Sequence, residues 1–83
     1  MMSNKEIEEI VAYLNKLQDA LLERDFSLES LQPELNKLNK VIEQLKNESA
    51  ENPDENSRMF FASIEYNAEQ FRNEILKRVA ENN

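Results

Sequence analysis

The side chains that could do chemistry in this 83-residue chain are carboxylates, amines and hydroxyls, because the sequence contains no histidine and no cysteine. Without an imidazole or a thiol there is no Ser-His-Asp arrangement, no thiolate nucleophile and no Cys/His zinc site. Glu65 and Glu69 would share one helix face and could bind a hard cation. A glutamate pair at this spacing is more typical of a solvated face, and Arg72 lies one turn further on. We therefore predict that the protein is not an enzyme and holds neither metal nor cofactor.

Apolar side chains that the core does not need are the better candidates for a function. Met59 and Tyr66 lie one heptad apart and project, together with Ala62, opposite the main apolar stripe of their predicted helix at about 100° per residue. One interpretation is a solvated tyrosine beside an incidental methionine. The other is a contact surface, because Tyr and Met are favoured where amphipathic helices meet partners. Phe26 has two interpretations as well, a hydrophobic staple at a helix end or a recognition residue.

Helices must position these side chains, because leucine and isoleucine recur at heptad spacing through the first half of the chain. One series is Ile7, Leu14, Leu21, Leu28, Leu35 and Ile42, and the companion series is Ile10, Leu17, Leu31, Leu38 and Leu45. Such spacing is typical of amphipathic helices that pack against one another. The leucines would be core residues in a closed bundle, or a groove for a partner if the bundle opens to accept another amphipathic helix. The candidate partner-binding residues are Phe26, Leu28, Leu31, Leu35, Leu38, Met59 and Tyr66.

Capping signals predict where the first and third helices begin. Ser3 followed by Glu6 matches a capping box, so we expect a first helix over residues 4–24. The run Asn52-Pro-Asp-Glu predicts the start of the third helix, with Asn52 as the N-cap and proline at the first helical position. We expect the third helix over residues 53–80.

Pro33 governs the prediction for the second helix. Proline has no amide donor and disfavours helical angles at the residue before it, so this helix is predicted to start between Ser30 and Pro33 and to cover about 31–48. The alternative is one long helix kinked at Pro33, because the heptad phase passes through the break unaltered.

Three helices joined by short turns pack most economically as an up-down-up antiparallel bundle. We therefore predict an all-α fold with a single helical domain over residues 1–83. The alternative is a hairpin of the second and third helices that dimerises through the first. A core of this size is marginally stable alone, so formation of a homodimer stays open.

The charge balance and the lengths of the apolar segments argue against two classes of partner, nucleic acid and membranes. Seventeen acidic residues against ten basic ones give a net charge of −7, and no basic stripe is present, so we expect no binding to nucleic acid. The opening MMSNKEIEEI is acidic and amphipathic, and no segment approaches the length of uninterrupted apolar sequence that a membrane span needs. We expect a cytoplasmic protein that does not enter a membrane.

Residues 21–38 resemble the middle of small flagellar type III export chaperones, especially the filament-cap chaperone group. The matching positions are Asp25, Phe26, Leu28, Leu31, Leu35 and Leu38. The resemblance implies an acidic helical bundle that holds the amphipathic helix of a secretion subunit in an apolar groove. This chain is shorter than the usual member, and Phe26 stands where a tryptophan is common.

A second likeness is to the small subunit of exonuclease seven, through Asp25-Phe-Ser-Leu-Glu29. That family usually has a glycine where this chain has Arg24, and it lacks a long aromatic third helix. This likeness implies a small non-catalytic helical subunit of a larger enzyme.

The function predicted from these patterns is that of a small helical binding protein, an adaptor or export-type chaperone that buries a partner's amphipathic helix. The alternatives are a structural protein that self-assembles through its heptads and a non-catalytic subunit of an enzyme. The binding and assembly functions rest on ordered apolar surface in a chain that lacks histidine and cysteine. The subunit function is what the likeness to exonuclease seven implies.

Overall fold

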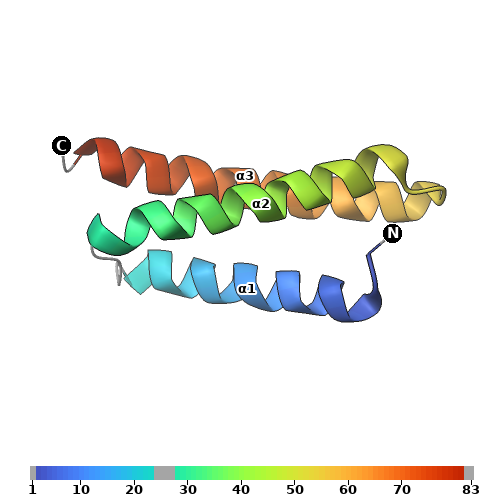
Figure 1. The fold of residues 1–83 in the computed structure, drawn as a ribbon, viewed down its shortest axis with the longest axis horizontal. Coiled ribbons are helices and arrows are strands. Elements are labelled where there is room, and N and C mark those ends of the chain that lie inside the picture. Colours follow the sequence, from blue (N-terminus) through green and yellow to red (C-terminus); the bar gives the residue numbers. More distant parts are fainter. Residues whose placement is uncertain (1, 24–27, 82–83) are drawn as a thin grey trace.

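The computed structural model describes residues 2–23 and 28–81, without the side chains of residues 28–30. Helix α1 spans Asn4–Glu23, α2 spans Leu28–Glu51 and α3 spans Glu55–Glu81. The three helices run up, down and up, side by side (Figure 1). The predicted all-α antiparallel three-helix bundle is therefore confirmed over the described residues.

Both ends of α1 are capped. The Ser3 hydroxyl accepts a hydrogen bond from the Glu6 amide at 3.2 Å and donates one to the Glu6 carboxylate, also at 3.2 Å, as the capping motif predicts. At the other end, the Arg78 guanidinium of α3 donates to the Leu21 carbonyl at 2.6 Å. A cation at this place complements the negative end of the α1 dipole, and α1 has no basic residue of its own in its last turn.

The cap of α3 differs from the prediction. The Asp54 carboxylate accepts hydrogen bonds from the Ser57 amide at 2.9 Å and from the Ser57 hydroxyl at 2.8 Å. Asp54 is therefore the N-cap, and the predicted N-cap role of Asn52 is wrong. The backbone of Asn52 still donates to the Glu48 carbonyl at 3.0 Å, so this residue closes the preceding helix, and its side chain accepts from the Asp54 amide at 2.9 Å.

The second helix is longer than predicted at both ends. It begins at Leu28, before Ser30, so Pro33 lies inside it rather than at its start. Proline removes one intrahelical hydrogen bond there, but the helix buries Leu31 and Leu38 on its inner face, and packing of this kind commonly overrides a local preference. At its C-terminal end the helix continues past the predicted residue 48 to Glu51.

The core lies between all three helices and follows the heptad series. The buried apolar residues are Ile10, Leu14, Leu17, Leu21, Leu31, Leu38, Val41, Ile42, Leu45, Phe61, Ala68 and Ile75. The α2 and α3 backbones run close together along their length, whereas α1 approaches the pair mainly through its side chains. The molecule is thus a tight α2–α3 hairpin with α1 laid along it (Figure 1).

Candidate protein-binding surface

A line of exposed residues runs along α3 on the side away from the core. Met59 is 66% exposed, Tyr66 is 63% exposed and Leu76 is 45% exposed, and Ala62 and Asn73 are exposed between them. These five residues, which we call the outer stripe of α3, recur at the three- and four-residue spacing of one helix face. The predicted projection of Met59, Ala62 and Tyr66 away from the core is confirmed.

Phe60 follows Met59 in the sequence but lies on a different side of α3, and its spacing places it with the core residues. It is nevertheless 49% exposed. Its ring meets the buried Phe61 edge to face, with centroids 5.6 Å apart. Edge-to-face geometry is the favourable arrangement for two aromatic rings. Phe60 is therefore exposed apolar surface outside the stripe, and its ring is held by a core residue.

Two opposite charges flank the outer stripe on the side that faces α2. The Glu65 carboxylate accepts a hydrogen bond of 3.0 Å from the Ser49 hydroxyl, and the Arg72 guanidinium donates to the Asn39 side chain at 3.4 Å. Both charged side chains are half-buried. Their contacts with α2 restrict them to positions beside the stripe.

The other predicted partner-binding residues lie elsewhere. Leu31 and Leu38 are buried in the core, and Leu35 is partly buried against it. Phe26 and the side chain of Leu28 lie outside the described part of the chain. In the folded bundle, therefore, a partner could reach Leu31 and Leu38 only if a neighbouring helix moved away.

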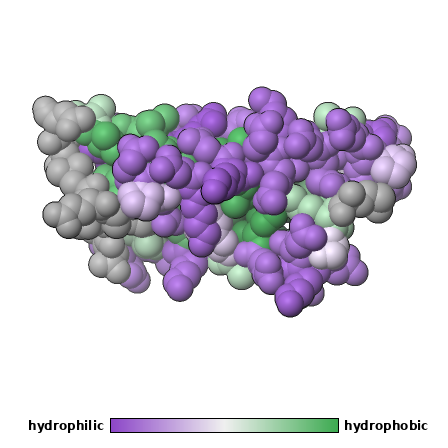
Figure 2. Space-filling model, in the orientation of Figure 1, coloured by the Kyte–Doolittle hydropathy of each residue, from purple (hydrophilic) through white to green (hydrophobic). Residues whose placement is uncertain are grey.

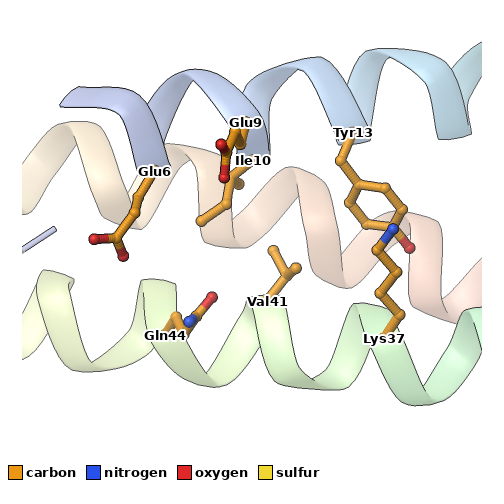
Figure 3. Close-up of a pocket in the computed structure, with 7 residues that line it drawn as sticks. All are labelled: Glu6, Glu9, Ile10, Tyr13, Lys37, Val41 and Gln44. Atoms are coloured by element: carbon orange, nitrogen blue, oxygen red, sulfur yellow. The ribbon is translucent and has the colours of Figure 1, made fainter. Parts of the chain in front are cut away.

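A groove of about 370 Å³ separates α1 from α2. Ile10 and Val41 face each other across it, and the Lys37 amine lies against the Tyr13 ring, 4.4 Å from the centroid (Figure 3). The Tyr13 hydroxyl donates to the Glu34 carboxylate at 2.7 Å. On the face made by α1 and α2, hydrophilic side chains dominate, and hydrophobic surface shows in the hollow between these helices (Figure 2).

The Tyr13 cluster is suited to holding α1 and α2 together rather than to catalysis. Burial of the phenol, and then its hydrogen bond to Glu34, raise the pKa of Tyr13 well above its ordinary value. A tyrosine with a raised pKa keeps its proton at neutral pH, so no phenolate is present to act as a general base. The sequence reasoning missed this cluster, although Glu34 and Lys37 are spaced to share one face of α2 and Tyr13 is the aromatic residue of α1.

A second groove, of about 270 Å³, lies between α1 and α3. Its apolar lining is Val11, Leu14, Ile64 and Phe71, and its polar lining is Asn15, Gln18, Asn67 and Gln70. All of these lining side chains are uncharged, although a third of the chain is charged. Grooves on both flanks of α1 agree with its looser attachment to the hairpin.

The described residues do not bring together acidic side chains that could hold a metal ion, and no helix among them is long and apolar enough to cross a membrane. Every buried side-chain nitrogen or oxygen in this part of the chain has a hydrogen-bond partner. Buried polar groups without partners are one sign of a catalytic site, and this sign is missing from the described residues.

No protein-family model, no curated protein and no solved structure matches this chain. The outer stripe of α3 places three exposed large apolar side chains, those of Met59, Tyr66 and Leu76, on one helix face.

Proposed function

We propose that this chain is a non-enzymatic helical protein-binding module, an adaptor that docks a partner's amphipathic helix on the outer stripe of α3. The observation that supports it is the exposure of Met59 and Tyr66, at 66% and 63%, one heptad apart on a rigid helix. Exposed apolar residues scattered singly are normal, but a line of them at heptad spacing is what a second helix packs against.

The chemistry of the outer stripe suits a helical partner. Methionine is flexible and polarizable, so it adapts to the side chains of the partner, and tyrosine offers an apolar ring with a hydroxyl for hydrogen bonding. Ala62 lies between them and allows the backbone of a partner helix to approach closely. The five residues of the stripe carry no charge, and the one carboxylate on the same face, that of Glu69 between Tyr66 and Asn73, can accept a hydrogen bond from a partner.

A second route to the same function follows the export-chaperone resemblance. In that version a partner's helix replaces α1 and packs on Leu31, Leu35 and Leu38 of α2. The grooves on both sides of α1 favour it. Against it, α1 is joined to the hairpin by the hydrogen bonds of Tyr13 to Glu34 and of Arg78 to the Leu21 carbonyl.

Selection of binders from a library of displayed amphipathic helices tests the proposal. Binders are then measured by isothermal titration against the parent chain and against the double variant Met59→Glu/Tyr66→Glu, which places charge on the outer stripe without touching the core. We expect affinity to fall by at least about tenfold, because burying an unpaired carboxylate is costly. The matched control is Asn36→Glu/Asn47→Glu, which adds the same two negative charges at exposed positions of α2 and should leave binding unchanged.

The outcome separates the two routes. Binders that lose affinity with the α3 variant support the outer stripe as the docking surface. Binders whose affinity is the same for the α3 variant and the parent contradict that surface. If such binders also speed hydrogen exchange at the backbone amides of Ile10 and Leu14 of α1, they support displacement of α1. Failure to select any binder of micromolar affinity counts against both routes.

A further inference from the structure

The outer stripe of α3, together with Glu69 on the same helix face, has a symmetric pattern along the helix. Three pairs of residues are centred on the same point, between Asn67 and Ala68: Met59 with Leu76, Ala62 with Asn73, and Tyr66 with Glu69. Two copies of α3 related by a two-fold axis through this point would place the members of each pair opposite one another. Met59 would then meet Leu76 of the second copy, and the Tyr66 hydroxyl would meet the Glu69 carboxylate. A two-fold interface requires such self-complementarity.

The flanking charges fit the same arrangement. Glu65 and Arg72 lie one heptad apart on the α2-facing side of the stripe, and each is held by one hydrogen bond to α2. In an antiparallel pair of helices, Glu65 of each copy lies beside Arg72 of the other. The interface would thus contain two attractive pairs, and charges in flanking positions are what set the orientation of paired helices.

A parallel arrangement is disfavoured by the same residues. It would stack Glu69 on Glu69 of the second copy and would bring Arg72 beside Lys77. Both are like-charge contacts, which are costly when partly desolvated. The charge pattern of α3 therefore selects the antiparallel orientation.

The distribution of charge over the chain favours α3 as the surface where two copies meet. The chain has a net charge of −7, but α3 contains five acidic and four basic residues and contributes only −1 of it. Helix α1 contains five acidic and two basic residues, so two copies that met there would repel more strongly. At a rise of about 1.5 Å per residue, α3 offers roughly 40 Å of helix for the contact.

From these observations we infer that the occupant of the outer stripe of α3 is a second copy of this chain, docked antiparallel through Met59, Tyr66 and Leu76. This inference rests on the proposed function, because it names the partner of the same surface. The dimer is a weak one, since each copy supplies only three large apolar side chains to it.

Sedimentation equilibrium of the full chain gives the first test. We expect a monomer–dimer equilibrium that shifts between about 10 µM and about 1 mM. A species that stays monomeric over this range overturns the inference.

Charge reversal tests the contact itself. Glu65→Arg alone and Arg72→Glu alone should each weaken the dimer by at least about tenfold, because each replaces attractive pairs with like-charge pairs. An equimolar mixture of the two variants should dimerise again, since position 65 of each copy then faces an opposite charge at position 72 of the other. Each variant keeps its altered contact with α2 in the mixture, so recovery reports contact between copies. Single variants that dimerise normally, or a mixture that stays monomeric, contradict the proposed interface.

Cysteine cross-linking tests the orientation, because the chain has no cysteine and an introduced thiol is unique. Ala62→Cys mixed with Asn73→Cys should form a disulfide between the two proteins under mild oxidation, whereas Ala62→Cys alone should cross-link poorly. Efficient cross-linking of Ala62→Cys to itself indicates a parallel pair and overturns the antiparallel arrangement.

Failure of this inference and failure of the proposed function are distinguishable. A monomer whose selected helical binders still require Met59 and Tyr66 keeps the docking surface and excludes the second copy. If the selected binders do not require Met59 and Tyr66 and the chain also stays monomeric, both the docking surface and the second copy are excluded.

Discussion

Tyr13 of α1 donates a hydrogen bond of 2.7 Å to Glu34 of α2 and stacks its ring under the Lys37 amine at 4.4 Å. One phenol therefore joins the more loosely packed helix to the hairpin through two kinds of contact, of which Figure 3 shows the one with Lys37. A hydrogen bond to a charged acceptor is stronger than a neutral one, and the cation–π contact adds to it.

Tyr13→Phe should destabilise the chain by about 1 kcal/mol near pH 7, because the ring and its contact with Lys37 remain while the hydrogen bond to Glu34 is lost. The raised pKa of Tyr13 adds a pH dependence. The unfolded chain releases the phenol proton near its ordinary pKa of about 10, whereas the folded chain retains it. The stabilising effect of the hydroxyl is therefore complete below about pH 10 and declines as the pH rises through the folded pKa.

Urea unfolding of Tyr13→Phe and of the parent chain between about pH 7 and pH 11 provides the measurement. The two stabilities should differ at neutral pH and converge at the alkaline end. Tyr66→Phe is the matched control, since its exposed hydroxyl should be worth less than about 0.5 kcal/mol at neutral pH. A constant difference between Tyr13→Phe and the parent at every pH would contradict this account of Tyr13.

The cap of α3 predicts an opposite dependence on pH. Hydrogen bonds from the Ser57 hydroxyl and amide lower the pKa of Asp54. A group with a lowered pKa stabilises the folded state above its unfolded pKa, near about 3.9, and this contribution is lost as the pH falls through the folded pKa. Asp54→Ala should therefore lower the melting temperature at neutral pH and lose this effect in acid.

Asp54→Asn is the matched comparison for the cap, because asparagine keeps an acceptor for the Ser57 amide but has no charge. Thermal unfolding followed by circular dichroism should place it between the parent and Asp54→Ala at neutral pH. If Asp54→Ala and the parent melt alike at neutral pH, the cap has been assigned to the wrong residue.

The fold could be predicted from the sequence because the heptad series indicates directly which face of each helix is buried. Leu14, Leu17 and Leu21 of α1 are buried as the spacing requires. Other positions of the same series are only partly buried against the core, such as Ile7 and Leu35. In a bundle of three short helices, each helix contacts two neighbours over a limited arc, and periodicity alone does not define where that arc ends.

The features that could not be predicted depend on competition or on the axial offset between helices. Asn52 and Asp54 are both good cap residues, and the choice depends on which backbone amides the preceding helix has already used. The contact of Tyr13 with Glu34 depends on how far α1 slides along α2, which no local pattern encodes. The exposure of Met59 and Tyr66 was predictable, because it depends only on their angle around a single helix.

Ala68 tests the closeness of α2 and α3. It is fully buried, at 0% exposure, in the middle of α3. Ala68→Leu should destabilise the chain by about 1–3 kcal/mol, because the larger side chain forces the hairpin apart. Ala62→Leu makes the same change on the exposed side of α3 and should alter stability by less than about 0.5 kcal/mol. If the two substitutions change the free energy of unfolding in urea equally, Ala68 is not buried between α2 and α3.

Pro33 gives a test in which the sign of the effect decides between two helix starts. Because Pro33 lies inside α2, Pro33→Ala should restore a hydrogen bond to the Glu29 carbonyl and stabilise the chain by about 1 kcal/mol, after the greater freedom of the unfolded chain is deducted. Were Pro33 in the first turn of the helix, as the predicted start between Ser30 and Pro33 requires, the same substitution would destabilise the chain.

Pro53→Ala is the control for Pro33, because Pro53 lies between α2 and α3 and outside both. There its ring costs the folded chain no helical hydrogen bond and lowers the conformational entropy of the unfolded chain. Loss of the ring should therefore destabilise the folded chain by about 0.4–1 kcal/mol. Opposite signs for the two prolines in chemical unfolding support a helix that begins at Leu28. Destabilisation by both would mean that α2 begins at Pro33, and the first turn of α2 would then be a loop that joins it to α1.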